Sequence, residues 1–170
     1  MKTFLMIGMH RSATSLVAKG LSLAGVHVGD ALLGAMPSNP YGHWEDVDFI
    51  AMNDWLLANA GGSWDNPPPE QAILEAGKRH EKDIVRLVRA KEREPLWGWK
   101  DPRNTLTARA YLPHLKNPHL VASFRDPLEV ARSLAVRENW PPERGYNLAV
   151  TYHERLMRLL EDWWKIKPLS

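Results

Sequence analysis

Three short apolar runs, residues 3–7, 96–100 and 119–124, are each followed at once by polar or charged residues. The segments between them carry apolar residues at helical spacing. Short apolar strands that alternate with helices are typical of a parallel sheet covered by helices. The sequence therefore predicts an α/β protein with three layers, α/β/α, around a short central parallel sheet.

The helices are predicted from apolar spacing, from glycines that can end them and from prolines that can begin them. Residues 70–94 are predicted to form one long, highly charged helix with a solvated polar face. Residues 26–45, rich in Gly, Pro and Asn, are predicted to form a loop. The other predicted helices are 14–24, 46–60, 105–115, 128–137 and a last one from the prolines at 141–142 to about 164. A chain of 170 residues fits a single domain, residues 1–170.

The polar segments that follow the strands are predicted to meet at one place. They are residues 8–15, 100–103 and 125–126. In open parallel sheets, ligands bind at the carboxyl ends of the strands. We therefore expect a ligand site at this edge of the sheet.

The segment 8–15, with the sequence GMHRSATS, links the first strand to the first helix. Such a turn directs backbone N–H groups and the positive end of the helix at one point, where an anion binds well. Ser12, Thr14 and Ser15 add hydroxyl donors. The forked guanidinium of Arg11 suits phosphate or sulfate. An ordinary helix N-cap is the alternative, but it explains neither the glycine nor the arginine of this segment.

The segment is P-loop-like without being a Walker A motif, which reads G-x-x-x-x-G-K-[ST]. Ala13 stands at the position of the second glycine, and Thr14 at the position of the lysine. The Mg²⁺ and γ-phosphate chemistry of that motif therefore loses its usual support. We predict a P-loop NTPase-like fold, and a kinase of a small metabolite and a non-catalytic nucleotide-binding module remain as alternative functions.

The GMHRSATS segment resembles the 5′-phosphosulfate loop of sulfotransferases, especially of a bacterial branch related to carbohydrate sulfotransferases. Residues 125–133 (RDPLEVARS) resemble the family's 3′-phosphate motif, in which an Arg at a strand end is followed eight residues later by a helical Ser. The resemblance implies that the donor is 3′-phosphoadenosine 5′-phosphosulfate (PAPS) and that the product is adenosine 3′,5′-bisphosphate. The donor-binding residues that it implies are His10, Arg11, Ser12, Ala13, Thr14, Ser15, Arg125 and Ser133.

Two further segments, residues 39–45 (NPYGHWE) and 97–103 (WGWKDPR), are similar to this branch, so the resemblance runs from about residue 3 to about residue 160. Ala13 replaces a glycine of the family loop. Leu16 replaces an aromatic residue that cytosolic members often stack on adenine. The family also usually continues beyond the equivalent of this chain's last residues, which implies a domain without the usual C-terminal portion.

The resemblance implies sulfonyl transfer to a hydroxyl or amine of an unidentified acceptor, with a carbohydrate as one candidate. The reaction needs a cation where charge builds on the leaving phosphate. Arg11 is the first candidate for that role and Lys100 the second. A base must take the proton of the acceptor. Glu45 and Asp101 both remain candidates, and the histidines of the same segments are weaker ones.

Composition narrows the other classes of function. A net charge of +2 is too small to indicate a nucleic-acid-binding protein, and the lack of cysteine excludes disulfides and thiolate catalysis. The seven histidines have no metal-ligand spacing, so no metal site is predicted. No apolar run approaches a membrane span and no signal peptide is recognisable, which fits a cytoplasmic protein. Trp44 and Trp64 suit either stacking on a sugar or packing in the core.

Overall fold

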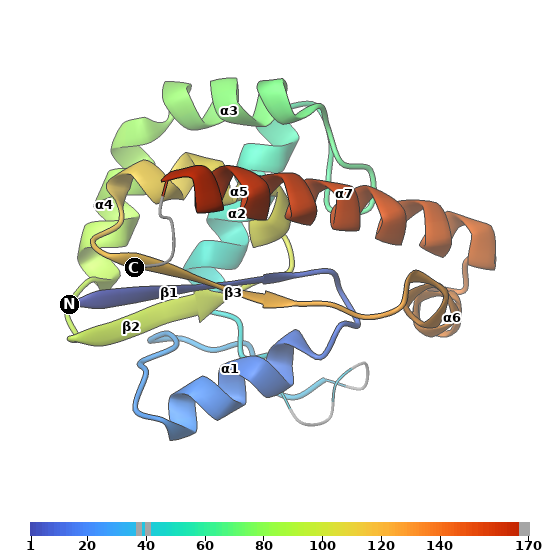
Figure 1. Ribbon diagram of the computed structural model, residues 1–170, viewed down its shortest axis with the longest axis horizontal. Helices are drawn as coiled ribbons and strands as arrows, with labels where there is room; N and C mark the ends of the chain where they lie inside the picture. Colours follow the sequence, from blue (N-terminus) through green and yellow to red (C-terminus); the bar gives the residue numbers. More distant parts are fainter. Residues whose placement is uncertain (37–38, 40–41, 167–170) are drawn as a thin grey trace.

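The computed structural model describes residues 1–36, 39 and 42–166, so the predicted loop 26–45 and the segment 39–45 lie partly outside the described residues. Three parallel strands, β1 (Lys2–Gly8), β2 (Leu96–Lys100) and β3 (Pro118–Ser123), form a sheet in the order β2-β1-β3 (Figure 1). In this register Phe4 of β1 lies opposite both Gly98 and His119. The predicted α/β class and the short parallel sheet are confirmed.

The helices alternate with the strands along the chain, as the apolar spacing predicts. The helix predicted at 105–115 ends in a 3₁₀ turn that contains Pro113, because proline cannot continue the α-helical hydrogen bonding. In the described part of the chain the helices are α1 (Thr14–Leu23), α2 (Val47–Asn59), α3 (Glu70–Arg79), α4 (Glu81–Lys91), α5 (Asn104–Tyr111), the 3₁₀ turn Leu112–His114, α6 (Pro127–Glu138) and α7 (Pro142–Ile166).

Alternate residues of β1 face two separate cores, one on each side of the sheet. Met6 packs with Ala18 of α1 on one side. Leu5 and Ile7 pack on the other side, in a cluster that includes Phe49 of α2. Figure 1 shows α1 below the sheet and α2, α3, α5 and α7 above it. The molecule therefore has three layers, and both faces of the parallel sheet are covered, as such sheets require.

The prediction of one long helix over residues 70–94 is wrong, because α3 ends and α4 begins at His80. The backbone of His80 has φ −113° and ψ 20°, and its imidazole packs on Trp55 with ring centroids 3.7 Å apart. The charges on either side fit two helices. Basic residues occupy the last turn of α3 and acidic residues the first turn of α4, each at the end whose partial charge they complement.

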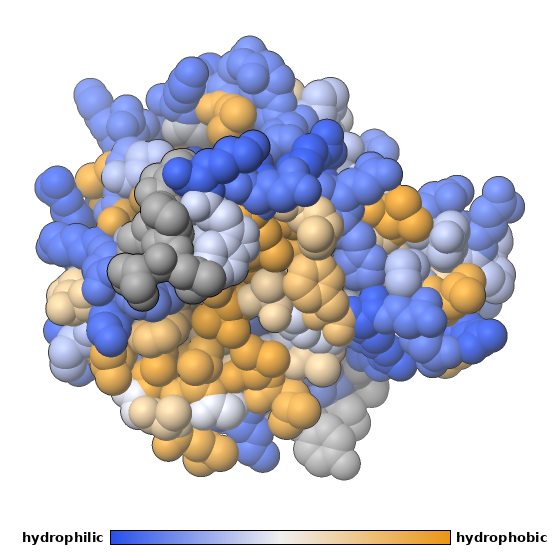
Figure 2. All heavy atoms as spheres, in the orientation of Figure 1, coloured by the Kyte–Doolittle hydropathy of each residue, from blue (hydrophilic) through white to orange (hydrophobic). Residues whose placement is uncertain are grey.

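The outward face of α1 carries exposed apolar side chains beside the exposed Lys19. Leu16 is 70% exposed and Leu23 is 81% exposed, and Figure 2 shows apolar side chains gathered over this part of the surface. The predicted correspondence of Leu16 to an aromatic residue of cytosolic sulfotransferases is not tested by the structure, in which Leu16 faces outward. Among the described helices, none combines the length and the apolar character needed to cross a membrane.

Candidate functional site

A cavity of about 260 Å³ opens where the three strands end. Segments that are distant in the sequence supply its walls: the loop after β1, the residues that follow β2 and β3, the segment before α2, and α6. The lining residues are His10, Arg11, Ala13, Thr14, Ser15, Asn39, His43, Glu45, Lys100, Pro102, Arg125 and Arg137. The predicted convergence of polar strand ends is therefore present in the structure, and it encloses a polar cavity.

The loop between β1 and α1 is tightly wound. A side chain at Gly8 would bring its Cβ within 2.7 Å of the carbonyl oxygen of Ser123, so only glycine lets β1 and β3 approach this closely. The backbone N–H of Gly8 donates to the hydroxyl of Thr105 over 2.9 Å. Arg11 and Ala13 both have positive φ, 66° and 59°. These two left-handed residues turn the chain sharply into the first turn of α1.

We expect Ala13→Gly to raise the free energy of unfolding by about 1 kcal/mol, because the left-handed conformation is costly for a residue with a Cβ and free for glycine. Ala51→Gly is a matched control, since Ala51 is an exposed helical residue of α2. The control should lower the free energy of unfolding by about 1 kcal/mol. Urea denaturation measures both. A loss of the same size in both variants would contradict the strain at Ala13.

Arg11 connects the loop to α6. Its Nε donates to Oγ of Ser133 over 2.7 Å. Arg125, at the end of β3, donates from its guanidinium to the carbonyl oxygen of Arg11 over 2.8 Å and lies 3.6 Å from Glu129. The two segments that the sequence analysis assigned to the 5′ and the 3′ ends of a nucleotide are therefore in direct contact. Ser133 itself does not line the cavity.

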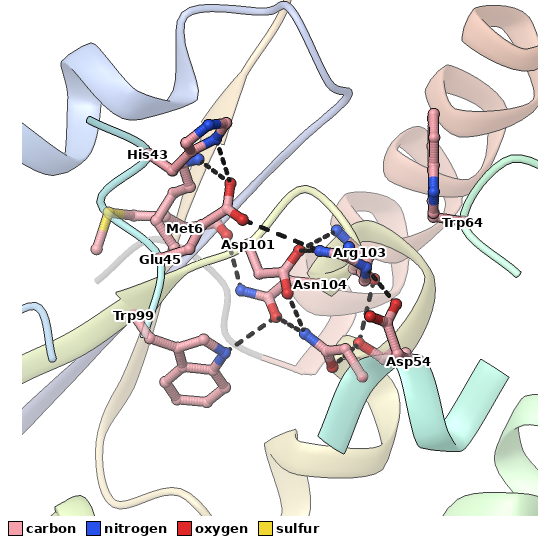
Figure 3. A network of polar contacts seen from close by, with 12 residues as sticks. Met6, His43, Glu45, Asp54, Trp64, Trp99, Asp101, Arg103 and Asn104 are labelled. Carbon is pink, nitrogen blue, oxygen red and sulfur yellow. Dashed lines mark hydrogen bonds and ion pairs between the residues drawn. The ribbon is translucent and has the colours of Figure 1, made fainter. Parts of the chain in front are cut away.

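Glu45 and Lys100 form a buried ion pair at the cavity wall. The Nζ of Lys100 lies 2.5 Å from Oε1 of Glu45, and the two side chains are 2% and 7% exposed. The imidazole of His43 lies 4.0 Å from the same oxygen (Figure 3). Burial raises the pKa of Glu45, although the positive charge of Lys100 opposes that effect. A carboxylate with a raised pKa accepts a proton more readily than an exposed one.

A second ion cluster holds the segment that carries Glu45. The Nζ of Lys91 lies 2.7 to 3.1 Å from the carboxylates of Asp30, Asp46 and Asp48. Asp46 also caps α2, because it accepts from the backbone N–H of Asp48 over 3.0 Å. Lys91 thus ties the residues on either side of Glu45 to α4, and the sequence analysis did not anticipate this role.

Asp101 faces away from the cavity and does not line it. Its Oδ2 accepts from Asn53 over 3.0 Å, and its Oδ1 accepts from the backbone and the guanidinium of Arg103 over 2.9 and 3.0 Å (Figure 3). Its side chain is fully buried. Of the two carboxylates that the sequence analysis left open as a base, only Glu45 lies at the cavity, and Asp101 holds the turn after β2.

The other residues of the loop 8–15 differ in whether they line the cavity. Thr14 and Ser15 line the cavity, and the hydroxyl of Ser15 donates to the carbonyl oxygen of His43 over 3.0 Å. Ser12 does not line it: its Oγ is buried and has no hydrogen-bond partner among the described residues, while its carbonyl oxygen accepts from Ser123. The prediction of a hydroxyl donor at Ser12 therefore lacks support from its position.

Asn39 and Arg137 are lining residues that the sequence analysis missed. Asn39 donates to the carbonyl oxygen of Gly42 over 2.7 Å and to the hydroxyl of Ser15 over 3.3 Å. Arg137 follows Ser133 by four residues on α6, and residues with this spacing share a helix face. The spacing of four residues from Ser133 was therefore the sequence signal that could have identified Arg137 as a site residue.

The two tryptophans considered for sugar stacking lie in packed surroundings. Trp64 is placed between His10 and Trp140, with ring centroids 4.5 and 5.7 Å away, and does not line the cavity. Trp44 packs against the apolar cluster that contains Met6 of β1 and Ala18 of α1. Neither position favours contact with a ligand in this cavity.

No protein-family model, curated protein or solved structure matches this chain. Within the described residues, no group of three or more His, Cys, Asp or Glu side chains is arranged to hold a metal ion. The geometry of the cavity is therefore the basis for a functional proposal.

Proposed function

We propose that the protein is a PAPS-dependent sulfotransferase with a P-loop-like donor site, and that the cavity holds the phosphosulfate end of the donor. The observation that carries the proposal is the meeting of the loop 8–15 with Lys100 and Arg125 around one cavity. Each of the three comes from the end of a different strand. The resemblance of these same segments to sulfotransferases adds support that is independent of the geometry.

The charge of the cavity favours a ligand with several negative groups. Four cationic side chains, Arg11, Lys100, Arg125 and Arg137, line it together with one carboxylate, Glu45. A nucleotide that carries a phosphosulfate and a separate 3′-phosphate matches this excess. The volume of about 260 Å³ lies just below the range of about 300–1,000 Å³ for drug-sized ligands, so it suits the anionic end and leaves the adenosine outside.

The contacts suggest how the group transfer proceeds. The acceptor oxygen or nitrogen bonds to sulfur as the bond from sulfur to the 5′-phosphate oxygen breaks, and adenosine 3′,5′-bisphosphate leaves. Lys100 has three N–H donors on Nζ. One binds Glu45, and another can meet the charge on the bridging oxygen. Glu45 takes the acceptor's proton, and its burial favours that protonation.

Calorimetric titration in EDTA tests the donor site. Adenosine 3′,5′-bisphosphate should bind without Mg²⁺ and more tightly than AMP, because the 3′-phosphate adds a charged contact. ATP with Mg²⁺ should bind more weakly. A preference for ATP with Mg²⁺ would overturn the proposal in favour of a phosphotransferase, and the lack of any nucleotide binding would leave a scaffold without a donor site.

Arg125→Ala should weaken the binding of adenosine 3′,5′-bisphosphate about 10- to 100-fold and leave that of AMP nearly unchanged, because a charged hydrogen bond is worth about 1.5–3 kcal/mol. Arg132→Ala is the matched control on α6. Its side chain is 72% exposed, pairs with Glu129 and lies outside the cavity. Equal losses for both nucleotides in Arg125→Ala would mean that Arg125 supports the loop through the carbonyl of Arg11 and does not contact the 3′-phosphate.

A further inference from the structure

The buried position of Glu45 leaves open where its proton goes after the proposed transfer. Each transfer releases one proton, because a neutral O–H or N–H of the acceptor becomes an anionic sulfate ester or sulfamate. Glu45 receives that proton, but its side chain is 7% exposed and its Oε1 lies 2.5 Å from Nζ of Lys100. Protonated Glu45 leaves the buried ammonium group without its counter-charge, which is unfavourable. The site therefore needs a second base that removes the proton and restores the ion pair.

His43 lines the same cavity and is more exposed than Glu45. Its Nδ1 lies 4.0 Å from Oε1 of Glu45, and its side chain is 18% exposed (Figure 3). Its backbone is held at both ends of the residue. The N–H donates to the carbonyl oxygen of Leu33 over 3.3 Å, and the carbonyl oxygen accepts from the hydroxyl of Ser15 over 3.0 Å. The imidazole is thus kept beside Glu45 at a place that solvent reaches.

The other described ionisable groups around Glu45 cannot take its proton. Lys100 and the guanidinium of Arg103, which lies 4.0 Å from Oε2 of Glu45, are cations with no acceptor atom. The carboxylate of Asp101 accepts hydrogen bonds from Asn53 and Arg103 and faces away from the cavity. Of these neighbours, only the imidazole of His43 is a free-standing base of suitable strength.

The charges around His43 favour the neutral ring while no anion is bound. Burial is the largest cause of its lowered pKa, and the nearby cations act in the same direction. A bound polyanion offsets those cations, so the ring accepts a proton more readily when ligand is in place. The charged and titratable groups that face His43 are Glu45 of its own segment, Lys100 after β2, Arg137 of α6, and Arg11 and His10 of the loop 8–15.

We propose that His43 takes the proton from Glu45 after each transfer and releases it to solvent. The acceptor's proton moves first to Glu45, while the acceptor bonds to sulfur and the electron pair of the breaking S–O bond leaves with the bisphosphate. The proton then passes from Oε1 of Glu45 to Nδ1 of His43, and a bridging water or a rotation of the ring spans the 4.0 Å between them. The ion pair with Lys100 is restored, and the imidazolium loses its proton to water as the anionic product leaves. This relay rests on the proposed sulfotransferase function.

The coupling of the two side chains can be measured without the acceptor. Nitrogen-15 NMR should show a lower pKa of His43 in Glu45→Gln than in the wild-type protein, because the carboxylate that favours the imidazolium is gone. Binding of adenosine 3′,5′-bisphosphate to the wild-type protein should raise that pKa. Calorimetry in two buffers of different ionisation enthalpy should detect proton uptake on binding. The uptake should fall in His43→Gln and stay unchanged in His27→Gln, whose imidazole pairs with Asp30 outside the cavity. An unchanged titration of His43 in Glu45→Gln would overturn the relay.

Turnover of PAPS tests the proton transfer itself, with water as the acceptor and released sulfate as the readout. His43→Ala should slow turnover about tenfold, less than the loss typical of removing a base, because Glu45 is still present. Added imidazole should restore most of the rate in proportion to its free-base concentration, which a purely structural role of His43 does not allow. Unchanged turnover in His43→Ala, or a loss that imidazole does not restore, would overturn the relay. Failure of the proposed donor differs from both: nucleotide binding would be absent, while the pKa difference of His43 in Glu45→Gln would remain and uphold the coupling.

Discussion

Lys100→Met should lower the free energy of unfolding by about 3–5 kcal/mol at pH 7, because it leaves the carboxylate of Glu45 buried without its partner. The two side chains are 2% and 7% exposed, so water cannot replace the lost ammonium group without a rearrangement of the site. Methionine keeps most of the volume of the lysine stem, which limits any cavity formed by the substitution. Urea denaturation at constant ionic strength measures the effect.

The loss of unfolding free energy in Lys100→Met should increase as the pH rises. Burial already raises the pKa of Glu45 against the charge of Lys100, and removal of that charge raises it further. A carboxyl whose pKa is raised in the folded state binds more protons there than in the unfolded chain. The stability of Lys100→Met relative to the wild-type protein should therefore be highest below the unfolded pKa of about 4.3. It should fall as the pH rises through the folded pKa of Glu45.

Two controls isolate the buried charge. Glu45→Gln combined with Lys100→Met should recover much of the stability and lose the added pH dependence, because neither position then leaves a buried charge without its partner. Lys165→Met removes a lysine that is 75% exposed and pairs with Asp162, itself 45% exposed, and it should cost less than about 1 kcal/mol. A pH-independent loss in Lys100→Met would show that packing of the lysine stem is the cause, and would contradict an uncompensated Glu45.

The strands and the position of the site could be predicted because both depend on local patterns. Residues 96–100 form β2 with the predicted bounds, since an apolar run that ends at Pro102 leaves little freedom. The segment 8–15 is likewise constrained by its own glycine and its place between a strand and a helix. Once the sheet is parallel, the ends of its strands share an edge, so Arg11, Lys100 and Arg125 are brought together by topology alone.

The features that could not be predicted depend on contacts between residues that are far apart in the sequence. The break at His80 is stabilised by Trp55, 25 positions earlier, while the apolar stripe of residues 70–94 continues without a clear stop. The sequence could not decide whether Glu45 or Asp101 is the base. That choice depends on Asn53 and Arg103, whose hydrogen bonds hold Asp101 away from the cavity. Sequence spacing carries no information on these pairings.

Asn53→Leu should lower the free energy of unfolding by about 3–5 kcal/mol, because this amide is the centre of a buried network. Its Nδ2 donates to Asp101 and to Asn104, each over 3.0 Å, and its Oδ1 accepts from Thr107 and Tyr111, each over 2.8 Å. Leucine fills a similar volume but satisfies none of the four groups. Each buried group left without a partner costs about 1–3 kcal/mol, and more when it is charged, as Asp101 is.

Asn59→Leu supplies the matched control on the same helix. Asn59 is exposed and its side chain donates only to the carbonyl oxygen of Trp55 among the described contacts, so the change should cost less than about 1 kcal/mol. Thr107→Val should fall between the two, because valine removes only one hydroxyl, whose single proton lies within reach of both Oδ1 of Asn53 and the carbonyl oxygen of Arg103. Since Asp101 fixes the turn directly after Lys100, Asn53→Leu should also weaken binding of adenosine 3′,5′-bisphosphate in the folded fraction. Equal stability losses in Asn53→Leu and Asn59→Leu would contradict the network and, with it, the positioning role of Asp101.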